Sequence, residues 1–160
     1  MQKKVVYVLL FILLSGCRPD EQPENMSAPI NEPRDAAQNP SAPLKVMERE
    51  ETGQYLADSA GMTLYYYLHD KRNVSTCANH CLDEWPPFYI GSSEIPEGFN
   101  EADFGVITRP DTGEKQTTYK GYPLYYFSRD QVAGQVNGYS LDDQWYTVNN
   151  SIERIALYKK

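Results

Sequence analysis

Two cysteines that flank a histidine are the side chains in this sequence whose spacing most directly suggests chemistry. Cys77 and Cys81 are separated by three residues, one of which is His80. At this spacing on a helix the cysteines share one face, with Cα atoms about 6 Å apart, and a disulfide tolerates that distance. Such a pair is expected to be oxidised if the chain is exported from the cytoplasm. We therefore predict a disulfide between Cys77 and Cys81.

The same segment leaves three other kinds of site open. Thiolates and imidazoles bind soft ions such as copper or zinc. The candidate metal ligands are Cys77, Cys81, His69, His80 and Asp83. Covalent haem attachment requires two residues between the cysteines and a His after them, but here three intervene and Leu82 follows. A thiol–disulfide oxidoreductase is also possible, although the spacing is one residue longer than the usual redox motif. No cofactor is expected, and haem, copper and zinc remain alternatives.

A second candidate is the spacing Tyr-x4-Asp, which occurs at Tyr65 and Asp70 and again at Tyr125 and Asp130. Five residues is an odd step, so on a straight strand the two side chains point to opposite faces. A contact between them requires the Asp to lie past the end of the strand. We expect each Asp to accept backbone hydrogen bonds in the turn that follows. The alternatives are a cation site and a carboxylate that holds a tyrosine hydroxyl.

These two motifs belong to a longer repeat. Residues 61–70 (GMTLYYYLHD) and 121–130 (GYPLYYFSRD) are identical at five of ten positions, and Trp85 and Trp145 follow at the same distance. A single unit of this size buries too little surface to be stable alone. We therefore predict that the two copies pack on each other.

The elements that position these residues are predicted to be strands. The copies cover about 54–109 and 110–160, and tyrosine-rich runs favour strands. Turn residues at 58–61 and 110–113 predict two hairpins, and a last strand is expected near 152–158. The predicted fold is mainly β, a compact antiparallel domain built from two related repeats. The repeated strands have no polar face, so both faces should be covered, as in central strands. The aromatic stripe is interpreted as core, with a ring-lined ligand groove as the alternative.

One short helix is predicted between Asn73 and Trp85, where it would carry the Cys-x3-Cys pair. Ser75 or Thr76 can cap its beginning, and the prolines that follow Trp85 end it.

The N-terminus predicts export and lipidation. Two lysines precede Val5–Leu14, an apolar run of ten residues, which suits a signal peptide and is too short to span a bilayer. Residues 14–17 (LSGC) resemble the lipobox of bacterial lipoproteins, in which the cysteine receives diacylglycerol. Residues 1–16 are therefore predicted to be removed, and Cys17 to be lipidated, which anchors the chain durably.

The mature chain is predicted to be a lipid-anchored tether followed by a domain. Residues 17–50 hold six of the eleven prolines and no aromatic residue, so they are expected to form a disordered tether before a domain at 51–160. Loss of the two leader lysines takes the formal net charge from −7 to −9. This charge argues against nucleic-acid partners. The expected location is the cell envelope, and the outer membrane if the cell is Gram-negative.

Several motifs together resemble those of a known family. They are Leu64-Tyr65-Tyr66 with Asp70, Cys77-x3-Cys81-x3-Trp85-Pro86-Pro87, Tyr119-Lys120-Gly121-Tyr122-Pro123-Leu124-Tyr125-Tyr126-Phe127 with Asp130, and Trp145-Tyr146-Thr147-Val148. This pattern is similar to the bacterial secreted-repeat lipoproteins with the Tyr-x4-Asp motif. The resemblance covers about 54–148 and implies an envelope lipoprotein with no defined chemistry. The chain departs from the family pattern at Tyr122, where His is frequent, and at residues 138–140, where the family turn is richer in glycine.

The sequence thus favours a non-enzymatic binding or scaffolding domain that is tethered to a membrane and has an undefined ligand. No catalytic residue is assigned, because no serine-hydrolase, phosphate-loop or dinucleotide motif is present. The possible ligand or structural residues are those of the repeated motif, namely Tyr65, Asp70, Trp85, Tyr125, Asp130 and Trp145. An envelope protein that handles electrons, metal or haem is the second hypothesis, and a thiol–disulfide oxidoreductase is the third.

Overall fold

The computed structural model describes residues 43–152. The predicted signal peptide, Cys17 and most of the predicted tether lie outside these residues, as does most of the predicted last strand. The elements in chain order are β1 (Lys45–Arg49), β2 (Gly53–Ala57), β3 (Tyr65–Tyr67), α1 (Cys81–Glu84), η1 (Glu101–Asp103), β4 (Phe104–Thr108), β5 (Lys115–Tyr119), β6 (Tyr122–Tyr125), η2 (Leu141–Asp143) and β7 (Trp145–Thr147).

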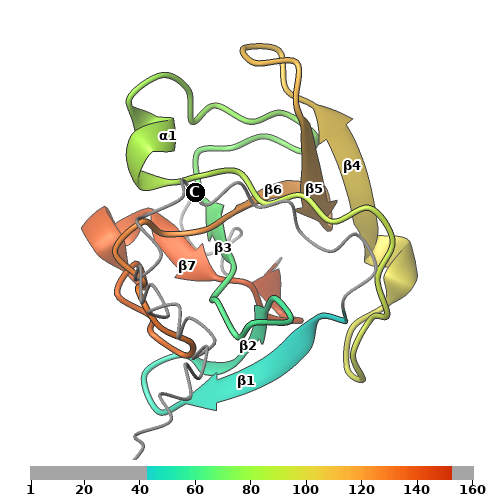
Figure 1. Ribbon diagram of the computed structural model, residues 1–160, viewed down its shortest axis with the longest axis vertical. Helices are drawn as coiled ribbons and strands as arrows, with labels where there is room; N and C mark the ends of the chain where they lie inside the picture. Colours follow the sequence, from blue (N-terminus) through green and yellow to red (C-terminus); the bar gives the residue numbers. More distant parts are fainter. Residues whose placement is uncertain (1–42, 153–160) are drawn as a thin grey trace, which may run out of the picture. The chain divides into compact units, whose positions relative to one another are not determined.

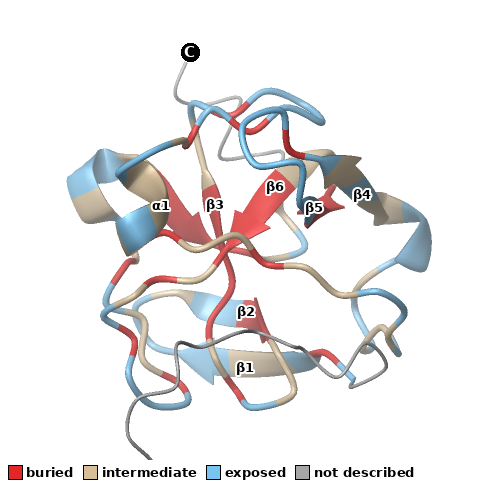
Figure 2. Cartoon of the chain, turned by 45° about the horizontal axis from the view of Figure 1, so that its top comes forward, coloured by how far each residue is buried: buried red, intermediate tan, exposed pale blue. Residues whose placement is uncertain are grey.

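The strands form two antiparallel sheets, which confirms the predicted fold class. The larger sheet has five strands in the order β4-β5-β6-β3-β7, and β1 pairs with β2 in a two-stranded sheet (Figure 1). The β4–β5 hairpin occurs where turn residues 110–113 predict it, whereas across residues 58–61 the pairing is reduced to a bridge between Ala57 and Thr63. β5 and β6 form a further hairpin. The repeated strands β3 and β6 lie side by side inside the larger sheet and are largely buried, as Figure 2 shows.

The two repeats exchange the segments that carry their tryptophans. β7, from the second repeat, pairs with β3, from the first, and the Val148 amide donates to the Leu64 carbonyl over 2.9 Å. The equivalent bond with the copies interchanged joins the Phe88 amide to the Leu124 carbonyl over 2.8 Å. Each repeat therefore completes the strand pairing of the other, which explains why the sequence needs two copies.

The repeated glycines allow the turns that lead into β3 and β6. Gly61 has φ +85° and Gly121 has φ +83°, which is a backbone region that side chains disfavour. A Cβ at Gly61 would also lie 2.9 Å from the Cβ of Ala133. The first turn is longer than the second, because Ala57 bridges to Thr63 whereas Tyr119 pairs directly with Tyr122.

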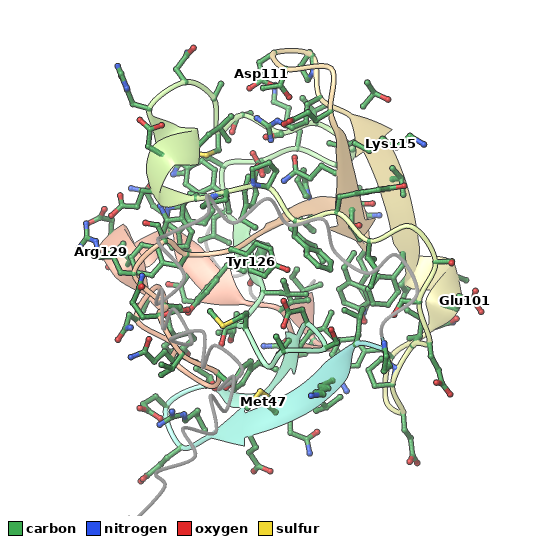
Figure 3. The ribbon with its side chains drawn as sticks, viewed as in Figure 1. Met47, Glu101, Asp111, Lys115, Tyr126 and Arg129 are labelled. Atoms are coloured by element: carbon green, nitrogen blue, oxygen red, sulfur yellow. A yellow bond between two sulfur atoms is a disulfide. The ribbon has the colours of Figure 1, made fainter. Side chains whose placement is uncertain are left out.

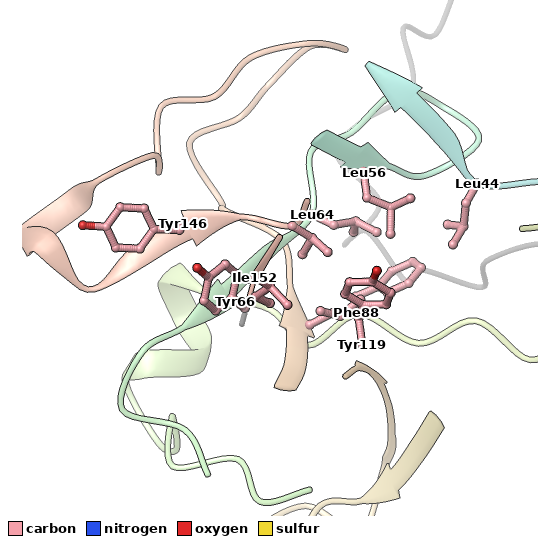
Figure 4. Packing of buried hydrophobic residues seen from close by; sticks show 10 residues of the cluster. Leu44, Leu56, Leu64, Tyr66, Phe88, Tyr119, Tyr146 and Ile152 are labelled. Atoms are coloured by element: carbon pink, nitrogen blue, oxygen red, sulfur yellow. The ribbon is translucent and has the colours of Figure 1, made fainter. Parts of the chain in front are cut away.

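The main core combines aliphatic and aromatic side chains from both repeats (Figure 4). Its buried members are Leu44, Leu56, Leu64, Tyr66, Phe88, Tyr119, Leu124, Tyr146, Val148 and Ile152. A second buried cluster contains the motif tyrosines and tryptophans. The interpretation of the aromatic stripe as core therefore agrees with the burial of these rings.

The folded region begins earlier than the predicted boundary at residue 51. Leu44 is buried in the main core, and Lys45–Arg49 forms β1 against β2. The local sequence is charged and has few apolar residues, so its ordering depends on the β2 strand beside it rather than on its own composition.

The predicted helix is shorter than expected and does not carry both cysteines. α1 covers Cys81–Glu84, and its N-cap residue His80 makes no side-chain capping bond. The predicted caps are wrong because Thr76 bonds to Asp70 instead, while Ser75 bonds to a tyrosine of the other repeat. Asn79 has φ +54°, which interrupts helical backbone before α1 begins.

Candidate functional site

The motif tyrosines are neighbours at the centre of the larger sheet. Tyr65 in β3 is paired with Tyr125 in β6, and both side chains are fully buried. Their alignment follows from the repeat, because the same position of each copy meets its counterpart across the β3–β6 pair.

Each tyrosine hydroxyl donates to the aspartate of the other repeat. The Tyr65 hydroxyl lies 2.7 Å from Oδ2 of Asp130, and the Tyr125 hydroxyl lies 2.7 Å from Oδ2 of Asp70. The Tyr-x4-Asp spacing relates a tyrosine and an aspartate within one copy, so it does not predict this exchange. The alternative in which a carboxylate holds a tyrosine hydroxyl is the one the geometry shows, but across the repeats.

The second oxygen of each carboxylate holds the loop that follows its strand. Oδ1 of Asp70 accepts from the backbone amide and the hydroxyl of Thr76, over 2.6 and 2.8 Å. Oδ1 of Asp130 accepts from the backbone amide of Asn137 over 3.0 Å. Each Asp thus also has the backbone partner expected of a turn residue, and it joins a loop of its own repeat to a strand of the other.

Burial controls the protonation of this site. It raises the pKa of Asp70 above the ordinary value of 3.8, and the hydrogen bonds from Thr76 and Tyr125 oppose part of that rise. Burial also raises the pKa of Tyr65 and Tyr125 well above that of a free phenol, and the neighbouring carboxylates contribute to the rise. Both phenols are therefore neutral donors at physiological pH.

A buried arginine, Arg109, extends the hydrogen bonds around Asp70. Its Nη1 donates to the hydroxyl oxygen of Ser75 over 2.9 Å, and the Ser75 and Tyr125 oxygens lie 2.6 Å apart. Because Tyr125 donates to Asp70, its oxygen accepts the Ser75 proton. The guanidinium is thereby linked to the Asp70 carboxylate through two hydroxyls, and its charge lowers the Asp70 pKa.

The remaining contacts of Arg109 fix two further segments. Nη1 also donates to Oε1 of Gln116, and Nη2 donates to the Cys77 carbonyl and to Oδ2 of Asp111. Asp111 lies in the hairpin loop between β4 and β5 (Figure 3). Arg109 was not predicted as a site residue. The available signal was its counterpart Arg49, sixty residues earlier, which donates to the Gly134 carbonyl. Counted by the sixty-residue offset, Arg49 and Arg109 occupy the same position of their copies, and each bonds to a loop of the opposite copy.

The motif tryptophans stack face to face beside the two tyrosines. The ring centroids of Trp85 and Trp145 are 3.7 Å apart and their planes differ by 1°. Tyr67 stacks on Trp145 and Phe127 stacks on Trp85, each at 4.3 Å. Tyr67, Trp145, Trp85 and Phe127 form a continuous stack, which we call the aromatic column.

The predicted disulfide is confirmed, with the Cα atoms of Cys77 and Cys81 5.4 Å apart. In this bonded state neither sulfur is a thiolate, so the metal set that includes them is not assembled. His80 is exposed and contacts Asp83, and His69 is exposed and packs beside Tyr67. Residues 43–152 contain no group of three His, Cys, Asp or Glu side chains that could hold a metal.

One surface groove among the described residues lies away from the motif residues. A groove of about 280 Å³ is formed by residues 90–95 and β4. Its lining residues are Ile90, Gly91, Ser92, Ser93, Ile95, Glu101, Phe104, Gly105, Val106 and Thr117. It includes none of the six motif residues, so the buried tyrosines and carboxylates do not line it.

The repeated architecture agrees with the comparison to known families. Residues 45–89 and 105–149 each match the family described as a secreted repeat of unknown function. The chain belongs to this family. The resemblance predicted from the sequence is therefore confirmed. No curated protein and no solved structure matches the chain.

The two matched segments of this secreted-repeat protein are the two copies that the exchanged contacts join. The first match contains β1–β3 and Trp85, and the second contains β4–β7 with Trp145. Every tyrosine–aspartate bond of the motif joins one matched segment to a residue of the other. In the part of the chain that the structure describes, no helix is long and apolar enough to cross a membrane.

Proposed function

We propose that this secreted-repeat protein is a lipid-anchored, non-enzymatic binding or scaffolding domain of the cell envelope, held at the outer membrane in a Gram-negative cell. The lipobox-like residues 14–17 and the proline-rich segment after Cys17 support the anchor and the tether. The acidic net charge supports a domain held away from anionic headgroups rather than one that lies on them.

One observation carries the non-enzymatic part of the proposal. The motif residues that could take part in acid–base chemistry are buried and hydrogen-bonded to one another. Tyr65 and Tyr125 are 0% exposed, Asp130 is 1% and Asp70 is 6%. Catalytic groups must reach a substrate within hydrogen-bonding distance. These four groups instead join the repeats, so the motif is a device that holds the domain together.

The setting of the disulfide gives little support to a thiol–disulfide oxidoreductase. Such an enzyme needs an accessible, reactive sulfur in a setting that stabilises its thiolate. Cys77 is 2% exposed and its carbonyl is held by Arg109, while Cys81 is partly buried beside the second core cluster. The disulfide therefore acts as a link that shapes the loop between β3 and α1.

The anchor is tested by replacing Cys17 with Ser in the full chain. We expect the unmodified protein to incorporate an alkyne-labelled fatty acid and to sediment with membranes, and density fractionation should place it in the outer membrane of a Gram-negative host. Cys17→Ser should carry no label and should not reach the outer membrane, because it has no lipid. Label on Cys17→Ser, or equal recovery of the two proteins in the outer-membrane fraction, would contradict the anchor.

The binding role is tested by cross-linking in intact cells. A binding or scaffolding domain should give discrete adducts at native expression level, identified by mass spectrometry. The Cys17→Ser variant is the matched control, because it retains the domain but lacks the lipid that is proposed to place it. An anchored, folded protein that gives no discrete adduct would contradict the binding role.

A further inference from the structure

The aromatic column has a geometry that core packing alone does not favour. Aromatic pairs prefer offset or edge-to-face contacts with centroids about 4.5–7 Å apart, because the ring quadrupoles repel in a direct stack. The 3.7 Å separation of Trp85 and Trp145, with planes 1° apart, lies below that range. Two indoles this close can share a positive charge that forms when one electron is removed.

Each tryptophan of the column contacts a tyrosine that has its own proton acceptor. Tyr65 meets Trp85 edge to face at 5.5 Å, and Tyr125 meets Trp145 in the same way at 5.2 Å. Their hydroxyls donate to Asp130 and Asp70. Removal of an electron makes a phenol strongly acidic, and a buried cation is costly. A carboxylate at 2.7 Å allows the proton to leave at once.

The two ends of the column differ. Tyr67 is partly exposed, and the exposed His69 lies beside it with centroids 5.2 Å apart. The Tyr67 hydroxyl donates to the Gln144 amide oxygen, which is not a base, so this ring can pass a charge on but has no strong proton acceptor. At the other end Phe127 is difficult to oxidise, and the Arg129 guanidinium lies over its ring. Positive charge can therefore enter at Tyr67 and is opposed at Phe127.

From this geometry we propose that the aromatic column is a one-electron relay that carries oxidising equivalents from Tyr67 through the tryptophan pair to Tyr65 and Tyr125. The oxidant is a diffusible one-electron oxidant such as a small inorganic radical, which gains the electron that the column loses. The tryptophan cation then takes an electron from a tyrosine. The phenolic O–H bond breaks and the proton moves to Oδ2 of the cross-repeat aspartate, leaving a neutral phenoxyl radical and a carboxylic acid. This function goes beyond the proposed binding role and does not depend on it.

Two neighbouring tyrosines provide matched controls. Tyr66 is buried, but its hydroxyl has no hydrogen-bond partner among the described residues. Tyr126 donates to Oδ2 of Asp58, and its ring meets Phe88 edge to face. Tyr66 therefore differs from Tyr65 and Tyr125 in its hydroxyl, and Tyr126 differs from them in packing on a phenylalanine.

The two histidines of the sequence allow an oxidant to be placed at a chosen position. A ruthenium polypyridyl complex is attached to His69 of the full chain, purified in detergent and carrying His80→Gln. The control carries the complex on His80 in a His69→Gln background, where the label lies beside Asp83 rather than Tyr67. A flash with a soluble electron acceptor produces ruthenium(III). Transient absorption and electron paramagnetic resonance then distinguish indolyl from phenoxyl radicals.

With the label on His69 we expect an indolyl signal that gives way to a phenoxyl signal. Tyr65→Phe combined with Tyr125→Phe should remove the phenoxyl signal and prolong the indolyl signal, whereas Tyr66→Phe and Tyr126→Phe should change neither. Asp130→Asn with Asp70→Asn should also reduce the phenoxyl signal. Moving the label to His80 should lower the yield of both radicals.

The relay is overturned if the phenoxyl signal survives unchanged in the Tyr65→Phe, Tyr125→Phe protein, or if neither radical forms with the label on His69. Circular dichroism of each labelled variant confirms that it is folded. Because phenylalanine preserves ring packing, the tyrosine variants keep the proposal testable even if the asparagine variants do not fold.

Discussion

Tyr65 is hydrogen-bonded to Asp130 of the other repeat and not to Asp70, the aspartate of its own Tyr-x4-Asp motif. Because the partner belongs to the other repeat, the motif stabilises the association of two copies rather than the conformation of one. The predictions below follow from this exchange and from the contacts around it.

Coupling energies should reveal the exchanged partners. Tyr65→Phe should lower the free energy of unfolding by about 1–3 kcal/mol, because a buried bond to a carboxylate is lost. In a double-mutant cycle by urea denaturation, Tyr65→Phe should couple with Asp130→Asn. The cycle with Asp70→Asn is the control and should be close to additive. Stronger coupling to Asp70 than to Asp130 would contradict the observed pairing.

Neither repeat should fold alone. A fragment that ends at Arg109 lacks β7, which pairs with β3, and Trp145, which stacks on Trp85. We expect residues 43–109 to show no cooperative thermal transition by circular dichroism. Mixing them with residues 110–160 should restore strand signal, because each fragment supplies the exchanged segment of the other. A cooperative melt of the first fragment by itself would refute this prediction.

The buried Arg109 should be far more important for stability than its repeat counterpart. Arg109→Lys cannot satisfy Ser75, Gln116 and the Cys77 carbonyl together, and disruption of a buried charged network costs about 3 kcal/mol or more. Arg49 is exposed and makes a single described bond, to Gly134, so Arg49→Lys is the matched control and should have a much smaller effect. Chemical denaturation of both variants compares the two positions. Similar losses at both would show that burial is not the cause.

Two aspartates should contribute to stability with opposite dependence on pH. The folded pKa of Asp70 is raised by burial, so its stabilising contribution is complete below 3.8 and is lost as pH rises through the folded pKa. The Arg109 hydrogen bond lowers the pKa of Asp111, so that contribution is present above 3.8 and is lost as pH falls through its folded pKa.

Asparagine variants separate these two contributions. The stability of the wild-type protein relative to Asp70→Asn should rise on acidification from neutral pH, whereas its stability relative to Asp111→Asn should fall. Unfolding free energies measured from neutral to acidic pH test both signs. A change in the same direction for both variants would disprove the assignment.

The disulfide should make a modest contribution to stability. It closes a short loop, for which chain entropy gives about 2 kcal/mol. Cys77→Ala combined with Cys81→Ala should therefore lower the unfolding free energy by about this amount and leave the domain folded. Thiol labelling of the unfolded wild-type protein without reductant should detect neither residue, and labelling after reduction should detect both. Full labelling before reduction would show that the bond is absent.

Features that depend on local spacing could be predicted from the order of the residues. Alternating side chains and turn residues predicted the hairpin between β4 and β5, because strand periodicity and turn chemistry act over a few residues. Identity at an offset of sixty residues predicted two packed copies, and the Cys77–Cys81 spacing predicted their bond. The predicted start of the helix was wrong. Ser75 and Thr76 can cap a helix, but here their hydroxyls are hydrogen-bonded to Tyr125 and Asp70.

Which copy supplies each partner follows from the packing of the two copies and not from spacing within either one. The spacing within one copy places Tyr65 near Asp70 in sequence, yet the antiparallel pairing of β3 with β6 brings Tyr65 to Asp130. The segments exchanged between the copies, β7 beside β3 and Pro87 beside Tyr125, bring Trp145 to Trp85. The loop that holds Ser75 and Cys77 makes Arg109 a buried donor. These contacts depend on how two whole units meet, and no local pattern of residue types encodes that geometry.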